Sequence, residues 1–220
     1  MPSIAVRKKL VKYAIVKFEK CNVIANGISS AKDFLIRNPT PPNKEYSIVI
    51  VANFYSSVKG HAVAIRALKY MPANYRFTFI GEGILLESII ELAAELGVED
   101  RLEFMGGLSN TALRVELKNF DLMVVPSLSE SFGMVAIEAM AAGLPVIASC
   151  VGGLPDVIGK ANEDALFKPN NPRLLGECVV RICENSTRWL ELHNLGIQRV
   201  KSEFSVQVMA EKYSEIFNEK

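Results

Sequence analysis

The sequence predicts an α/β domain in which helices flank a parallel sheet. Short apolar runs alternate along the chain with stretches of helical periodicity, and this alternation is typical of parallel strands joined by helices. Several of the apolar runs end in turns that contain glycine or proline. The chain has 220 residues, of which 50% are hydrophobic, so it is long enough to bury one such core, with room for a small appendage but not for a second domain.

The elements of this domain follow from the pattern in order. The predicted strands are residues 46–52, 76–80, 102–105, 122–125, 145–148 and 165–168. The predicted helices are residues 61–70, 85–96, 111–118, 134–142 and 154–158. Gly97 suits the left-handed cap that ends the second of these helices. The C-terminal tail is predicted to be helical at residues 172–184, 187–201 and 206–217.

Composition excludes several classes of protein. The formal net charge is +1, so no broad basic face indicates a nucleic-acid partner. The four cysteines and two histidines show no metal-ligand spacing, which favours a reduced, cytoplasmic chain without a structural metal. No apolar run is long enough to span a bilayer, and no signal peptide is recognisable.

Two acids, Glu130 and Glu138, lie eight residues apart on either side of a glycine turn. The turn joins the strand 122–125 to the helix 134–142. Its residues Ser131, Phe132 and Gly133 are expected to present free backbone N–H groups at the helix N-terminus, where the helix dipole favours an anion. Glu130 is expected at the carboxyl end of the strand, which is where ligands bind in an open α/β sheet.

Carboxylates repel phosphate, so two acids beside a phosphate site need an explanation. A sugar nucleotide supplies one, because its diphosphate can accept from the N–H groups while sugar and ribose hydroxyls donate to the carboxylates. Taken singly, Glu130 could be a solvated loop acid and Glu138 an ordinary first-turn helix acid. The ordered series favours the ligand-binding interpretation: Pro126, Gly133, Gly143, Pro145, Gly152 and Gly153.

The stretch from Val125 to Ala148 resembles the Glu-x7-Glu signature of retaining, nucleotide-sugar glycosyltransferases of the family-4 (group 1) type, which have the two-domain GT-B architecture. The resemblance covers about residues 22 to 217. It implies a single Rossmann-like domain, the C-terminal donor-binding half of GT-B. It also implies that Glu130 orients the donor sugar, that Glu138 holds the ribose hydroxyls, and that the backbone of Ser131, Phe132, Gly133 and Met134 contacts the diphosphate.

The loop after the first strand resembles a second part of the family's site. There the family usually has a Gly-Arg pair followed by Lys-Gly, whose two cations neutralise the donor diphosphate. Lys59 and Gly60 match, but Asn53 occupies the arginine's place, where it is expected to contact the donor diphosphate with a neutral hydrogen bond in place of a charge. The resemblance therefore assigns Lys59, with Glu130, to catalysis, and the missing cation is expected to weaken stabilisation of the leaving diphosphate. Outside this context Lys59 would be interpreted as a surface charge. His61, at the start of the next helix, is expected either to be solvated or to approach the diphosphate.

Two glycine turns resemble the family's nucleoside-binding loops. Gly81 and Gly83 follow the strand 76–80 in the manner of a Gly-x-Gly turn, and Gly106 belongs to a Phe-x-Gly loop that lines the base pocket. By themselves such glycines indicate only tight turns. The resemblance implies a nucleoside diphosphate sugar as donor substrate and neither a metal nor another cofactor.

The stretch from Val23 to Ser29 resembles the entry into the donor domain, so residues 1–22 are expected to be a residual helix of a missing N-terminal acceptor domain and residues 23–220 the nucleotide-sugar-binding domain. The first segment carries an apolar stripe opposite four basic residues. The stripe is Leu10, Val11, Ala14, Ile15 and Phe18, opposite Arg7, Lys8, Lys12 and Lys17. This helix could pack on the donor domain, dock an acceptor-domain partner, or lie on the inner face of a membrane.

The implied reaction is metal-independent transfer of a sugar from a nucleoside diphosphate to an acceptor hydroxyl, with retention, in polysaccharide or glycolipid biosynthesis. The acceptor half would be a missing N-terminal domain or a partner. Two alternatives stay open: a non-catalytic nucleotide-sugar-binding module, and a subunit of a split glycosyltransferase. Other GT-B classes fit less well, because phosphorylases need a pyridoxal-bearing lysine and a far larger chain, and no epimerase signature is present.

Overall fold

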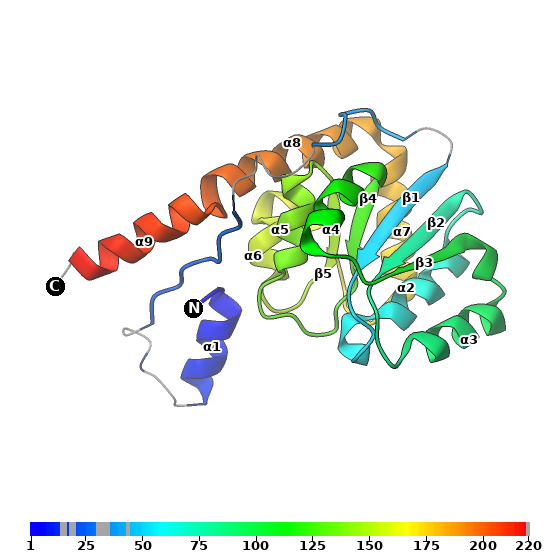
Figure 1. Ribbon diagram of the computed structural model, residues 1–220, viewed down its shortest axis with the longest axis horizontal. Helices are drawn as coiled ribbons and strands as arrows, with labels where there is room; N and C mark the ends of the chain where they lie inside the picture. Colours follow the sequence, from blue (N-terminus) through cyan, green and yellow to red (C-terminus); the bar gives the residue numbers. More distant parts are fainter. Residues whose placement is uncertain (14–16, 18–20, 30–35, 43–44, 219–220) are drawn as a thin grey trace.

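A six-stranded, all-parallel sheet forms the centre of the molecule (Figure 1). The computed structural model describes residues 1–13, 17, 21–29, 36–42 and 45–218. The strands lie in the order β3-β2-β1-β4-β5-β6. They are β1 (Tyr46–Val51), β2 (Tyr75–Ile80), β3 (Leu102–Gly106), β4 (Leu122–Val125), β5 (Val146–Ser149) and β6 (Leu166–Phe167). Strands β4 and β5 consist of buried residues throughout, as expected for parallel strands covered on both faces.

Helices cover both faces of this sheet (Figure 1). On one side α2 packs against α3 and α7, and on the other α5 packs against α8. The helices that follow the strands are α2 (His61–Ala67), α3 (Leu86–Leu96), α4 (Asn110–Glu116), α5 (Met134–Ala141) and α6 (Leu154–Ile158). The C-terminal region forms α7 (Pro172–Glu184), α8 (Ser186–Glu203) and α9 (Val206–Asn218).

The predicted fold class is confirmed: the domain is a Rossmann-like parallel sheet flanked by helices, with a helical C-terminal region. The predicted strands and helices differ from the observed ones mainly at their ends. The predicted helices at 61–70 and 111–118 are shorter α-helices that continue as 3-10 turns, η4 (Leu68–Tyr70) and η6 (Leu117–Asn119). Gly97 ends α3 at φ 63°, in the left-handed cap that the sequence predicted.

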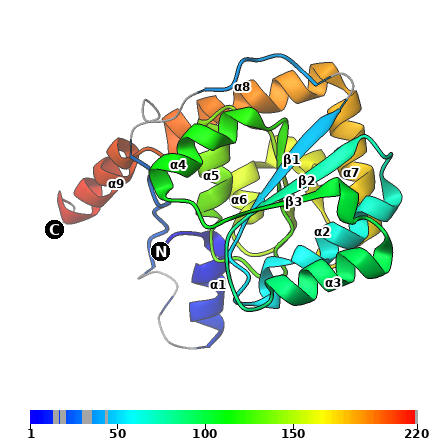
Figure 2. The same ribbon diagram turned by 45° about the vertical axis from the view of Figure 1, so that its right-hand side comes forward.

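Two helices extend from the body of the domain, α1 (Ile4–Lys12) and α9 (Figures 1 and 2). Neither has a buried residue. Of the predicted apolar stripe, Leu10 and Val11 are half-buried on α1, while Ala14, Ile15 and Phe18 lie outside the described residues. Among the helices that the structure describes, none has the length and hydropathy needed to cross a bilayer. The division of the chain at residue 22 stays a prediction.

Candidate functional site

Most of the predicted site residues follow β1 or β4, the two strands between which the strand order reverses direction. β1 is paired with β2 on one side and with β4 on the other, so the chain leaves these central strands in opposite directions. In an open α/β sheet this topological switch point forms a crevice at the carboxyl ends of the strands, where ligands bind. Lys59 comes from the loop after β1, and Glu130 comes from the loop after β4.

Lys59 and Glu130 form an ion pair that joins these two loops. The distance from Lys59 Nζ to Glu130 Oε2 is 2.8 Å. The other carboxylate oxygen, Oε1, accepts the N–H of Ser131 at 3.1 Å. Because its side chain is only 16% exposed, Glu130 is not the freely solvated loop acid of the alternative interpretation. The pair therefore places one cation and one carboxylate side by side, between the loops that follow β1 and β4.

Close backbone contact between the two loops brings this pair together. Gly60 has φ 74°, and a Cβ atom at this residue would overlap the carbonyl oxygen of Pro126. The N–H of Leu128 donates to the carbonyl of Val58 at 2.7 Å. Only glycine allows both the left-handed backbone and this approach, so the Lys59-Gly60 sequence fixes Lys59 beside the β4 loop.

The turn between Glu130 and α5 leaves donors available for an anion. Gly133 is the N-cap residue of α5, at φ 106°, and no side chain caps the helix. Within the part of the chain that the structure describes, no protein acceptor pairs with the N–H groups of Phe132, Gly133 or Met134. Three unpaired N–H groups at a helix N-terminus attract negative charge. The N–H of Ser131 is already bonded to Glu130, so its predicted role is the least supported of the four.

Glu138 lies one turn into α5 and is half-buried. Burial raises the pKa of its carboxyl group above the ordinary value, and the charge of Arg114 on α4 partly opposes this rise. A carboxylate withdrawn from water in this way gains from accepting hydroxyl donors. The arrangement is compatible with the predicted ribose contact, which stays a prediction.

A cavity of about 450 Å³ lies beside the switch point, at the carboxyl ends of β1, β2 and β3. Asn53 and Gly81 are among the residues that line it. The complete lining is Val51, Ala52, Asn53, Ile80, Gly81, Glu82, Gly107, Leu108 and Leu113. Gly83 lies in the turn after β2 and Gly106 is the last residue of β3, and neither lines the cavity. The carbonyl of Gly106 accepts the N–H of Gly81 at 2.8 Å. The glycine turns therefore lie beside one cavity whose volume is typical of small-molecule sites, and the predicted nucleoside contact stays a prediction.

Asn53 has a partner that the sequence did not suggest. Its Oδ1 accepts the backbone N–H of Glu82 at 3.3 Å and so ties the β1 loop to the turn after β2. An arginine, which has no acceptor atom, could not make this bond. The structure thus brings Asn53 to the cavity wall, while its contact with a diphosphate stays a prediction.

His61 is neither solvated nor free to approach a diphosphate, so both sequence interpretations of this residue are wrong. It is 2% exposed, its Nε2–H donates to the carbonyl of Ala52 at 3.1 Å, and its ring stacks on Phe54. Burial, together with the charge of Lys59, lowers the pKa of His61 below 6.5. The signal was present in the sequence, because His61 shares the helical spacing of the buried residues Ala64, Ile65 and Leu68.

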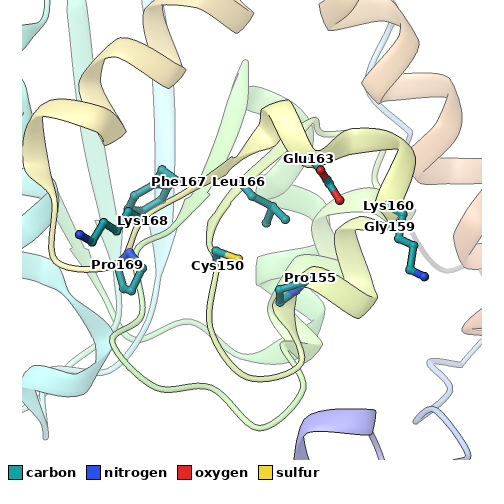
Figure 3. A pocket seen from close by; sticks show the side chains of 9 residues that line it. All are labelled: Cys150, Pro155, Gly159, Lys160, Glu163, Leu166, Phe167, Lys168 and Pro169. Carbon is teal, nitrogen blue, oxygen red and sulfur yellow. The ribbon is translucent and has the colours of Figure 1, made fainter.

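A second cavity, of about 610 Å³, opens at the ends of β5 and β6 (Figure 3). Its wall includes the side chains of Cys150, Pro155, Leu166 and Phe167, and none of the predicted site residues lines it. All four cysteines are free thiols, and Cys150 is the exposed one. Within the described residues, no three His, Cys, Asp or Glu side chains are grouped to hold a metal ion. No sequence pattern indicated this cavity beside Cys150.

Comparison with known proteins identifies the class that this fold and site define. Residues 32–198 match the family model described as glycosyl transferases group 1. An uncharacterized glycosyltransferase of Methanocaldococcus jannaschii is 30% identical over 175 residues, which are 74% of this chain and 45% of the relative. The chain therefore belongs to the group 1 glycosyltransferases.

Two further similarities agree with this assignment. The 2-deoxystreptamine glucosyltransferase of Streptomyces kanamyceticus is 33% identical over 66% of this chain and 38% of its own. HepE of Anabaena, solved in complex with UDP-glucose, is similar in fold, with a TM-score of 0.85 at 20% identity over 100% of this chain and 63% of that one. The chain thus spans roughly half the length of the relatives it matches. The sheet and helices correspond to one domain of the GT-B fold.

Proposed function

We propose that this chain is the donor-binding half of a retaining glycosyltransferase that transfers a sugar from a nucleoside diphosphate to an acceptor hydroxyl. The acceptor half would come from a further domain or from a partner chain. The product would be a polysaccharide or a glycolipid, and a glycolipid acceptor would bring the protein into peripheral contact with a membrane. We expect the transfer to need no metal ion.

The observation that carries the proposal is the set of N–H groups at Phe132, Gly133 and Met134, which have no acceptor among the described residues, in the same loop as Glu130, the partner of the Lys59 ammonium group. Backbone N–H groups at a helix N-terminus and a lysine together suit a diphosphate. Negative charge develops on the nucleoside diphosphate as it leaves, so the same donors that bind it would also stabilise the transition state.

Glu130 and Glu138 flank these donors and supply the acceptors that a sugar nucleotide needs. Glu130 would accept hydrogen bonds from hydroxyl groups of the donor sugar, with one carboxylate oxygen 2.8 Å from Lys59 Nζ. Glu138 would accept the ribose hydroxyls from its half-buried place on α5. The base would enter the 450 Å³ cavity next to Asn53 and Gly81. UDP is the first nucleotide to test, because HepE was solved with UDP-glucose.

Calorimetric titration of the chain with UDP and with uridine tests the proposal. UDP is expected to bind at least about tenfold more tightly than uridine, because only UDP reaches the N–H groups and Lys59. ADP and GDP, each compared with its nucleoside, extend the test to other bases. Equal affinity for nucleoside and diphosphate in every pair, or no binding of any diphosphate, would overturn the proposed function.

The ribose role of Glu138 leads to a specific prediction. Glu138→Ala is expected to weaken UDP binding by about 1 to 3 kcal/mol, the value of a charge-assisted hydrogen bond. The same variant should bind 2′,3′-dideoxy-UDP as the wild type does, because that ligand has no hydroxyl to lose. Glu138→Gln, which keeps an acceptor oxygen, serves as the control. If a folded Glu138→Ala variant loses the same affinity for UDP and for 2′,3′-dideoxy-UDP, the carboxylate does not bind the ribose hydroxyls.

Asn53 favours a second candidate function, a nucleotide-sugar-binding module without transfer activity. In the family an arginine usually supplies a second cation at this place, whereas here the side chain is bonded to the backbone of Glu82. The candidates are separated by mixing the chain with an acceptor-domain partner and assaying transfer from UDP-glucose. Turnover supports the split enzyme, and tight binding without turnover in any pairing supports the module.

The contact of Asn53 with Glu82 gives a further prediction. Asn53→Ala frees the N–H of Glu82 and loosens the turn that lines the cavity, so uridine binding is expected to weaken about fivefold. Asn53→Asp keeps the acceptor and should bind uridine normally, yet it should bind UDP less well because it adds a negative charge. Calorimetry with both ligands measures these effects. If Asn53→Ala binds uridine like the wild type, Asn53 does not organise this cavity.

A further inference from the structure

Ser3, the N-cap residue of α1, contacts the loop proposed to bind the donor diphosphate. Its side chain is buried, at 1% exposure. The hydroxyl accepts the N–H of Val6 at 3.2 Å and donates to the carbonyl of Ser131, which is 128 residues away, at 2.7 Å. A hydroxyl group can accept and donate at the same time, so one side chain both caps α1 and holds the loop.

A second hydrogen bond joins the same two parts of the chain. The N–H of Ile4 donates to Asp156 Oδ2 at 3.2 Å, and Asp156 lies in the first turn of α6. This turn is itself packed on the loop, because the N–H of Gly153 donates to the carbonyl of Glu130 at 3.2 Å. The first turn of α1 is therefore bonded to the loop directly through Ser3 and indirectly through Asp156.

The contact of Ser3 has a consequence for the donors of the loop. In a trans peptide the carbonyl of one residue and the N–H of the next point to opposite sides of a rigid plane. Fixing the carbonyl of Ser131 toward α1 therefore fixes the N–H of Phe132 away from α1. This N–H group is the first of the three donors at the start of α5 that have no acceptor in the described part of the chain.

We propose that Ser3 is a positioning residue, which, with Asp156, latches α1 to the Glu130–Gly133 loop and orients its N–H groups for the donor diphosphate. The proposal rests on the proposed function. It gives the α1 segment a direct effect on donor binding: when α1 is seated, the peptide plane of Ser131 is held in the binding orientation, and when α1 leaves, the plane is free to turn.

The test compares Ser3→Ala with Ser3→Thr in the full chain. Ser3→Ala is expected to weaken UDP binding about five- to tenfold, the effect of losing one neutral hydrogen bond, and to leave uridine binding unchanged. Ser3→Thr keeps the hydroxyl and should retain the affinity for UDP. Asp156→Ala should also weaken UDP binding, because it removes the hydrogen bond from the N–H of Ile4. Ser205→Ala is the matched control, since Ser205 caps α9 through the N–H of Val208 and does not bond to the loop.

Hydrogen exchange of the ligand-free chain provides a second measurement, which does not depend on nucleotide binding. Peptides that contain Ser131 to Met134 should exchange faster in Ser3→Ala than in the wild type, Ser3→Thr or Ser205→Ala. If a folded Ser3→Ala variant shows unchanged exchange and unchanged UDP affinity, the positioning role of Ser3 is overturned, while the proposed donor-binding function stands. If the wild type binds no nucleoside diphosphate, the proposed function fails first, and faster exchange would then show a latch on a loop of another purpose.

Discussion

Replacing Lys59 with alanine is expected to weaken UDP binding by about 10- to 100-fold, which corresponds to the loss of a charged hydrogen bond worth about 1.5–3 kcal/mol. The ammonium group lies 2.8 Å from Glu130 at the mouth of the switch point. Its removal takes away the cation that attracts the diphosphate and leaves the carboxylate of Glu130 unpaired, so that repulsion adds to the loss. Calorimetry with UDP measures the effect.

Two variants make the Lys59 result specific. Lys69→Ala removes another lysine, whose Nζ donates to the carbonyl of Leu96, and it should bind UDP normally. Glu130→Gln leaves Lys59 free for the diphosphate, so UDP affinity should stay the same or rise, while the extra affinity for UDP-glucose over UDP should fall. If Lys59→Ala binds UDP as tightly as Lys69→Ala does, the diphosphate does not lie where we place it.

Gly152→Ala is expected to reduce the free energy of unfolding by about 2–4 kcal/mol and to abolish UDP-glucose binding. Gly152 has φ 55°, and a Cβ atom at this residue would overlap the carbonyl oxygen of Glu130. The substitution must therefore displace the backbone of Glu130, whose side chain is paired with Lys59. Chemical denaturation measures stability, and calorimetry measures binding.

Gly97→Ala is the matched control for this substitution. Gly97 also has a positive φ, 63°, but a Cβ atom there would meet no heavy atom within 4 Å. Gly97→Ala therefore introduces only backbone strain. The difference in the free energy of unfolding between the two variants isolates the contact with Glu130. Equal destabilisation of both variants, with UDP-glucose binding retained in Gly152→Ala, would contradict a rigid contact between the two loops.

The sequence predicted the fold well because each strand and helix is specified locally. Strand β4 is a continuous apolar run, β5 is apolar up to its last residue, Ser149, and α3 ends at the glycine that caps it. Turn residues and hydrophobic periodicity therefore located nearly every element. Their ends were less predictable, since α2 and α4 tighten into 3-10 turns in their last residues, which have no distinct sequence signal.

The sequence could suggest candidate site residues, but it could not predict the contacts between them. The ion pair of Lys59 with Glu130 joins residues 71 positions apart, and their distance depends on how two loops pack. The bond from Asn53 to Glu82 depends likewise on the packing of neighbouring loops, and that from Ser3 to Ser131 on the seating of α1. The burial of His61 is different, because helical spacing alone would have revealed it.

A crystal structure of this chain with UDP-glucose would show directly where the donor binds. We expect the diphosphate oxygens to accept from the N–H groups of Phe132, Gly133 and Met134 and from Lys59 Nζ, with the ribose at Glu138 and the sugar at Glu130. A nucleotide bound elsewhere, for example in the 610 Å³ cavity beside Cys150, with these donors unoccupied, would contradict it.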